Sequence, residues 1–112
     1  MSTQHLLIVE DDAGRRKISL LEEIYSVGRD PKCDIRLYSF FISRRHATLV
    51  RRQREDGSYY YQVIDGDAMK GRPSSCGILI NGRKVPSHDL ENGDKIFFTP
   101  EVHMKYYQLT EQ

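Results

Sequence analysis

Apolar and polar residues alternate along this chain in short runs, and no run shows the three-to-four-residue spacing of an amphipathic helix. Each run is rich in β-branched or aromatic side chains and ends at polar residues or glycine. The runs lie at residues 6–9, 17–21, 24–27, 35–37, 46–50, 59–64, 78–80, 84–85, 96–98 and 103–109. Turn signals recur about every 8 to 12 residues, a spacing that predicts an all-β sandwich or barrel.

Two intervals between the runs predict defined turns. Asn81-Gly82 separates two short runs, and because both residues readily adopt positive φ, the pair favours a two-residue type I′ hairpin. The polar residues 55–58 predict a second hairpin turn. Residues 65–77 form the longest irregular stretch, with glycines, a proline and two serines. A loop of that length in a compact domain is usually functional or mobile.

Length and charge narrow the classes of protein. With 112 residues, the chain has the usual size of one domain, and we expect a single domain over residues 1–112 with its core at about residues 6–109. Seventeen basic and sixteen acidic residues leave a net charge of +1, far from the strongly basic profile of a general nucleic-acid binder. We interpret the basic stretch at residues 44–54 as the solvated outer face of a strand.

Cysteine usage and hydropathy both predict a cytoplasmic protein. The two cysteines, Cys33 and Cys76, are too few and too scattered for a disulfide framework or a zinc site, so we expect reduced thiols and neither metal nor cofactor. No apolar run approaches the roughly 20 residues of a membrane span. Residues 1–5 lack the basic start and long apolar stretch of a signal peptide. We therefore expect a cytoplasmic protein that binds neither membrane nor nucleic acid.

Two polar clusters carry the most informative chemistry. Gly28-Arg29 follows one apolar run, and Ser43-Arg44-Arg45-His46 leads into another. Guanidinium, hydroxyl and imidazole groups that converge can hold an ionised phosphate, because charge-assisted donors outcompete water when several act together. A catalytic role for His46 is rejected, since no nucleophile and no orienting carboxylate accompany it at a suitable spacing. The clusters predict a site that holds a phosphate without breaking it, and we expect no enzyme.

An acidic pair near the N-terminus suggests a different class of protein. Residues 7–12 end in Asp11-Asp12 and resemble the magnesium-binding start of a response-regulator receiver domain. A receiver alternates strands with amphipathic helices, and the rest of this chain predicts none. We interpret the pair as a turn.

Four short motifs occur along the chain in a particular order. They are Gly28-Arg29, Ser43-Arg44-Arg45-His46, Ile80-Asn81-Gly82 and Leu90-Glu91-Asn92-Gly93-Asp94. On a strand-rich chain of this length they resemble the forkhead-associated (FHA) family, and the match spans about residues 6–109. The resemblance implies a two-sheet β-sandwich of about eleven strands, with ligand loops at one end. It also implies a non-enzymatic module that binds peptides in which a Ser/Thr kinase has phosphorylated a threonine.

The resemblance assigns roles to individual residues. It implies that Arg29 and Ser43 bind the phosphate and that Arg44 and Ser75 close the site around it. It also implies that His46 is buried and orients Ser43 through hydrogen bonds. Residues that would support the site without being its main ligands are Gly28, His46, Gly77 and Asn81. Of these, Gly28 is expected to let the chain bend sharply where a side chain would crowd it.

One position departs from the family pattern. The family commonly has Asn-Gly-Thr before the late hairpin, and its asparagine contacts the peptide main chain; this chain has Cys76-Gly77-Ile78. Because a thiol is a weak donor and acceptor, we expect Cys76 to weaken or alter the contact with the peptide. This departure supports an alternative hypothesis, in which an FHA-fold module binds proteins without phosphate, for example by self-association.

A further surface is implied next to the Ser43 cluster. The family reads the residue three positions after the phosphothreonine, and Tyr38, Phe40 and Phe41 would help to form that surface here. Neighbouring phenylalanines in a loop are costly unless something covers them. We therefore expect a preference for an apolar residue at that position of the ligand.

Overall fold

The computed structural model describes residues 3–110, and these residues form eleven strands without a helix. The strands are β1 (Thr3–Asp11), β2 (Gly14–Leu20), β3 (Ile24–Gly28), β4 (Ile35–Arg36), β5 (Ala47–Gln53), β6 (Tyr59–Asp65), β7 (Ile78–Ile80), β8 (Arg83–Val85), β9 (Ser87–Asp89), β10 (Lys95–Thr99) and β11 (Val102–Thr110). Over the same residues, the chain has no helix that could cross a membrane. The first two residues of the segment 1–5, and both ends of the domain expected over residues 1–112, lie outside the described residues.

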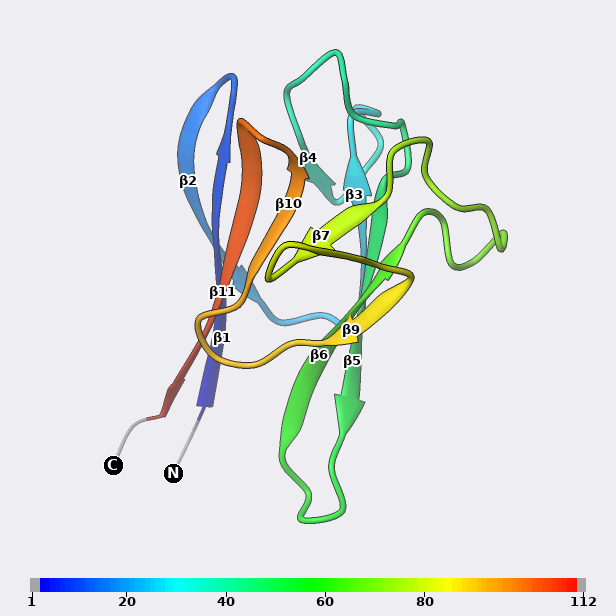
Figure 1. Cartoon of the computed structure of the whole chain (residues 1–112). Helices are drawn as coiled ribbons and strands as arrows, with labels where there is room; N and C mark the ends of the chain where they lie inside the picture. Colours follow the sequence, from blue (N-terminus) through cyan, green and yellow to red (C-terminus); the bar gives the residue numbers. More distant parts are fainter. Residues whose placement is uncertain (1–2, 111–112) are drawn as a thin grey trace.

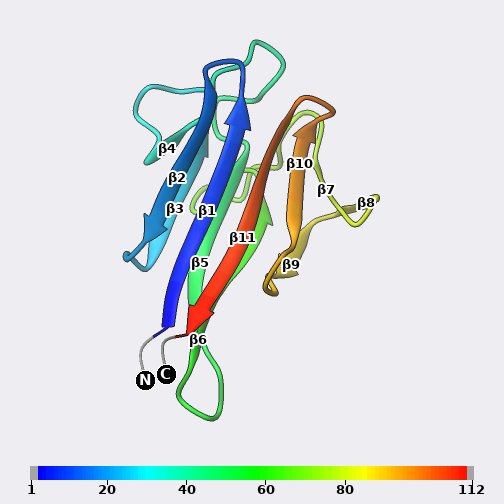
Figure 2. The ribbon, with the colours of Figure 1, turned by 90° about the vertical axis from the view of Figure 1, so that its left-hand side faces the viewer.

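Two sheets pack face to face, as Figure 1 shows. The larger has six strands in the order β2-β1-β11-β10-β7-β8, and the smaller has five in the order β4-β3-β5-β6-β9. All neighbouring strands are antiparallel except β3 and β4, which run parallel. Figure 2 turns the molecule so that β2, β1, β11 and β10 face the viewer. The predicted all-β sandwich of about eleven strands is confirmed.

The core follows from the alternation of side chains along the strands. In β1, Leu7 and Val9 point between the sheets and are fully buried, while Ile8 between them points outward. Tyr106 of β11 and Tyr61 of β6 are also fully buried and meet from opposite sheets, with ring centroids 6.4 Å apart. His5 is buried beside Tyr106, whose hydroxyl lies 2.6 Å from His5 Nδ1. This aromatic contact joins the two sheets at the end of the sandwich opposite the Gly28-Arg29 and Ser43–His46 clusters.

The turns agree with the sequence in part. Asn81 and Gly82 have φ angles of 53° and 77°, which confirms the type I′ hairpin between β7 and β8. The interpretation of Asp11-Asp12 as a turn is wrong for Asp11, which ends β1 with its side chain fully buried. Strand β9 was not predicted, because its residues are polar and carry no apolar alternation. It forms through backbone pairing with β6, which a side-chain pattern does not reveal.

Candidate functional site

Three loops meet at one end of the sandwich, and backbone hydrogen bonds join them. The loops lie between β3 and β4 (residues 29–34), β4 and β5 (residues 37–46), and β6 and β7 (residues 66–77), toward the upper right of Figure 1. Arg29 N–H donates to the Ser43 carbonyl at 3.1 Å, and His46 N–H donates to the Val27 carbonyl at 2.8 Å. These bonds place the Gly28-Arg29 and Ser43–His46 clusters side by side, although they are apart in the sequence.

Gly28 makes this close approach of the two clusters sterically possible. A Cβ atom at Gly28 would lie 2.7 Å from the carbonyl carbon of Arg44 and 3.0 Å from the amide nitrogen of His46, and it would overlap the Arg44 oxygen. Gly28 is not among the residues with positive φ. The glycine is therefore required because the two backbones approach too closely for a side chain to fit. The sharp bend expected at this position is not the reason for the glycine.

Arg29 and Ser43 both retain free donors. Arg29 Nε donates to the Ile42 carbonyl at 3.0 Å, and within residues 3–110 its guanidinium forms no ion pair. Its two terminal nitrogens therefore remain available. The Ser43 hydroxyl oxygen accepts a hydrogen bond from the Ser75 amide at 3.0 Å, which leaves the hydroxyl hydrogen free to donate. The hydrogen bonds at Arg29 Nε and Ser43 Oγ hold the two side chains in place and leave these donors free to bind a ligand.

His46 connects two of the loops from inside the protein. Its side chain is fully buried, its Nδ1 accepts the Ser43 N–H at 3.1 Å, and its Nε2 donates to the Gly77 carbonyl at 2.7 Å. The edge of Phe98 packs against the ring at 5.1 Å between centroids. Accepting at one nitrogen and donating at the other requires the neutral ring. Burial lowers the pKa of His46, in the direction that favours this neutral form, against the opposing effects of the Gly77 carbonyl and Asp65.

Ser74 and Asp65 shape the third loop, and the sequence did not single them out. The Asp65 carboxylate accepts hydrogen bonds from the Ser74 amide and the Ser74 hydroxyl, and Ser74 Oγ accepts the Gly77 N–H at 2.8 Å. These bonds set the path of the chain past Ser75 and Cys76, which are both exposed. An acid and a serine nine residues apart in an irregular stretch show no pattern that would reveal their contact.

A groove of about 720 Å³ begins at Arg29 and Arg44 and continues past Tyr38 and Phe40. Phe40 is 92% exposed and Phe41 is 79% exposed, so no residue of the described range 3–110 covers them. The structure thus brings together four of the residues singled out in the sequence. The other eight do not line the groove: Gly28, Phe41, Ser43, His46, Ser75, Cys76, Gly77 and Asn81. Of these, Asn81 lies in the turn between β7 and β8, and Ser75 approaches the site through its bond to Ser43.

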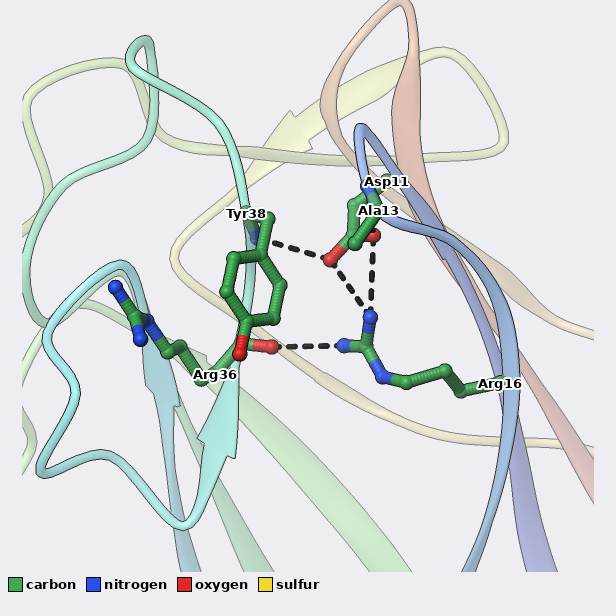
Figure 3. Close-up of polar contacts among 5 residues, drawn as sticks. All are labelled: Asp11, Ala13, Arg16, Arg36 and Tyr38. Carbon is green, nitrogen blue, oxygen red and sulfur yellow. Dashed lines mark hydrogen bonds and ion pairs between the residues drawn. The ribbon is translucent and has the colours of Figure 1, made fainter.

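Neighbouring residues of β1 and β2 brace the loop that carries the aromatic residues, as Figure 3 shows. The buried Asp11 carboxylate accepts hydrogen bonds from Arg16 at 3.1 Å and from the Tyr38 amide at 2.9 Å. Arg16 also donates to the Arg36 carbonyl at 2.8 Å. The Tyr38 ring lies between the guanidinium groups of Arg16 and Arg36, at 5.5 and 4.6 Å from its centroid. The sequence did not reveal this brace, because its partners come from separate parts of the chain.

The two buried histidines predict how stability depends on pH. Burial is the largest cause that lowers the pKa of both His5 and His46 from the ordinary value of 6.5. Between 6.5 and the lowered values, the unfolded chain binds protons that the folded chain does not, so the free energy of unfolding falls as pH falls. Denaturant titrations from about pH 8 to about pH 5 should show this loss beginning near pH 6.5.

Replacing His46 with glutamine should reduce the pH dependence, since one of the two groups is then removed. Carboxylates such as Asp30 cannot explain the loss, because a pKa lowered from 3.8 acts only at more acidic pH. An unfolding free energy that stays constant or rises on acidification through this range would contradict the assignment.

Comparison with known proteins finds a family model, a curated sequence and solved structures that resemble this chain. A family model described as "FHA domain" matches residues 25–99. The uncharacterized protein sll1895 of Synechocystis sp. is 33% identical over 100 residues, which are 89% of this chain and 14% of that protein. The chain therefore spans a small part of the length of this curated relative.

Solved structures share the fold. The crystal structure of the Slr1951 protein from Synechocystis sp. has 47% sequence identity and a TM-score of 0.87, covering 92% of this chain and 96% of that chain. The FHA domain of yeast Dun1, solved in complex with a doubly phosphorylated (pT) peptide derived from Rad53 SCD1, has 24% identity and a TM-score of 0.69. It covers 99% of this chain and 78% of that chain, and at this identity the likeness shows the fold alone.

Proposed function

Because this chain belongs to the FHA domain family, whose members are known as binding modules and not as enzymes, we propose that it binds phosphothreonine peptides. A Ser/Thr kinase would phosphorylate the threonine, and the domain would then bind the phosphorylated partner protein in the cytoplasm. The proposed binding unit is the single domain expected over residues 1–112, and its ligand end is the set of three loops described above.

The free donors of Arg29 and Ser43, held side by side, carry this proposal. A phosphothreonine has a charge of about −1.5 to −2 at neutral pH and three strong acceptor oxygens. The terminal nitrogens of Arg29 and the hydroxyl hydrogen of Ser43 are the complementary donors, and their supports are already in place. Arg44 lines the same groove as Arg29 and adds a second positive charge. His46 acts through Ser43 and Gly77, and has no exposed surface with which to touch a ligand.

The peptide side of the site would differ from the family pattern. Cys76 is exposed at the position of the family asparagine, and a thiol cannot replace the paired donor and acceptor of a carboxamide. The affinity for the peptide main chain would then depend more on the groove beyond Arg44. Tyr38 and Phe40 line that groove and Phe41 lies next to it, so their exposed rings would cover an apolar ligand side chain.

A degenerate phosphothreonine peptide library tests both parts of the proposal together. We expect binding only when the threonine is phosphorylated, with enrichment of apolar residues three positions after it, because exposed aromatic rings gain most from burying apolar surface. The same library with unphosphorylated threonine is the control. Selection of acidic residues at the third position would contradict the role of the aromatic groove.

The alternative function is protein binding without phosphate, including self-association through the exposed aromatic residues. Cys76 and the uncovered rings of Phe40 and Phe41 are the observations that favour it. Equal affinity for the phosphorylated and unphosphorylated libraries would support this alternative. Sedimentation of the isolated domain over a range of concentrations would then show whether the partner is a second copy.

A further inference from the structure

The outer face of the six-stranded sheet carries a row of lysines that the phosphopeptide site does not use. The strand register aligns Lys17 of β2, Ile8 of β1, Lys105 of β11 and Lys95 of β10 directly across four neighbouring strands. Their chain neighbours Leu7, Met104 and Ile96 are fully buried, so the side chains in the row point outward. Figure 2 shows these four strands facing the viewer. We call Lys17, Lys95 and Lys105 the lysine row.

The charges of the lysine row are not balanced within the sheet. Within residues 3–110, none of the three lysines forms an ion pair. The carboxylate on the adjacent row is Glu10, which already lies 3.4 Å from both Arg15 and His103. Lys95 and Lys105 are directly opposite each other, an arrangement that destabilises an antiparallel pair. On the two neighbouring rows, four cationic side chains are accompanied by one carboxylate, that of Glu10, whereas the chain as a whole has a net charge of only +1.

Apolar side chains lie among these cations. In the row next to the lysine row, His103 lies opposite Phe97, and Phe97 lies opposite Leu79. Leu79 is 42% exposed. Both aromatic rings on the face are partly covered: His103 lies against Phe97 at 4.9 Å, and Lys105 Nζ lies over Tyr107 at 5.1 Å. The face therefore offers positive charge and aliphatic surface, but few open ring faces.

We propose that the lysine row and the apolar residues beside it dock an acidic segment of a partner protein in which carboxylates alternate with apolar side chains. Carboxylates would neutralise the lysine row, and the apolar side chains would cover Ile8, Phe97 and Leu79. Single-stranded nucleic acid fits less well, because it binds through open aromatic faces and these rings are partly covered. Paired lysines that destabilise the sheet locally are expected where a surface serves binding. This surface lies on the side of the sandwich and is separate from the loop end.

The test uses a short synthetic peptide that alternates glutamate with leucine and phenylalanine, titrated into the labelled domain and followed by nuclear magnetic resonance. We expect the largest shifts at Ile8, Lys17, Lys95 and Lys105, and weaker binding as salt is added. The double substitution Lys17→Glu with Lys95→Glu should weaken binding by about tenfold or more. The control for each single charge reversal is Arg52→Glu, on an exposed strand position of the other sheet.

Two further measurements separate docking from folding and from phosphate binding. The single substitution Lys95→Glu turns a like-charge pair into an opposite-charge pair, so its unfolding midpoint should rise while docking weakens. Phosphopeptide affinity should be unchanged in both variants. Equal binding of the peptide by parent and double variant would overturn the proposal. So would binding of a single-stranded RNA oligonucleotide, or of vesicles of equimolar phosphatidylserine and phosphatidylcholine, without binding of the acidic peptide.

Discussion

Replacing Arg29 with alanine is expected to abolish phosphopeptide binding while leaving the fold intact. Truncating one partner of a hydrogen-bonded charge pair costs about 2–5 kcal/mol, or roughly a 30-fold to several-thousandfold loss of affinity. The guanidinium is exposed in the free domain, and its Nε bond to the Ile42 carbonyl is its fixed contact. The loss of stability should therefore be about 1 kcal/mol or less. Isothermal titration calorimetry and thermal denaturation of the same samples measure the two effects separately.

Arg29→Lys is the control that keeps the charge and removes the planar fork. We expect intermediate affinity, because an ammonium can pair with a phosphate as a point charge but cannot reproduce both the Nε support and two terminal donors. An alanine variant that titrates like the parent would show that the phosphate binds elsewhere. The lysine row would not be affected by that result, since it lies on another face.

Replacing Gly28 with alanine is expected to damage both the fold and the binding site. The new Cβ would meet the backbone of Arg44 and His46, and backbone atoms cannot turn aside as a flexible side chain can. Overpacking of this kind costs about 1–3 kcal/mol, occasionally more. The shift that relieves it must disturb the bonds from Arg29 N–H to Ser43 and from His46 N–H to Val27. Denaturant titration should show the loss of stability, and phosphopeptide affinity should fall at temperatures where the variant is still folded.

Gly57→Ala is the matched control, because Gly57 lies in the turn between β5 and β6, and its Cβ would meet no atom within 4 Å. Its φ of 89° makes alanine unfavourable there by about 1 kcal/mol, so the variant is destabilised with the site untouched. Phosphopeptide affinity should match that of the parent. If Gly28→Ala also bound like the parent, the close approach of the two clusters would not be needed for binding.

The alternation of apolar side chains was enough to predict most of the strands and the sandwich. Residues 59–64 were predicted as a strand and lie in β6, and Asn81-Gly82 was predicted as a type I′ turn and has the positive φ values it requires. Both are local properties, because strand alternation and turn conformation depend on neighbours in the chain. Strand β9 could not be predicted in this way, since its place is set by its pairing with β6.

By itself, the sequence determined the fold class and the residue types offered to a phosphate. Motif order and spacing pointed to Arg29, Ser43 and His46 as one group. Only the tertiary structure decided how the group is supported, through the Gly28 contact and the His46 bridge to Gly77. It also revealed the Asp11 brace and the lysine row, whose members come from different strands. The reason is physical: alternation and turn preferences act over a few residues, whereas these contacts join distant segments that only strand register and sheet packing bring together.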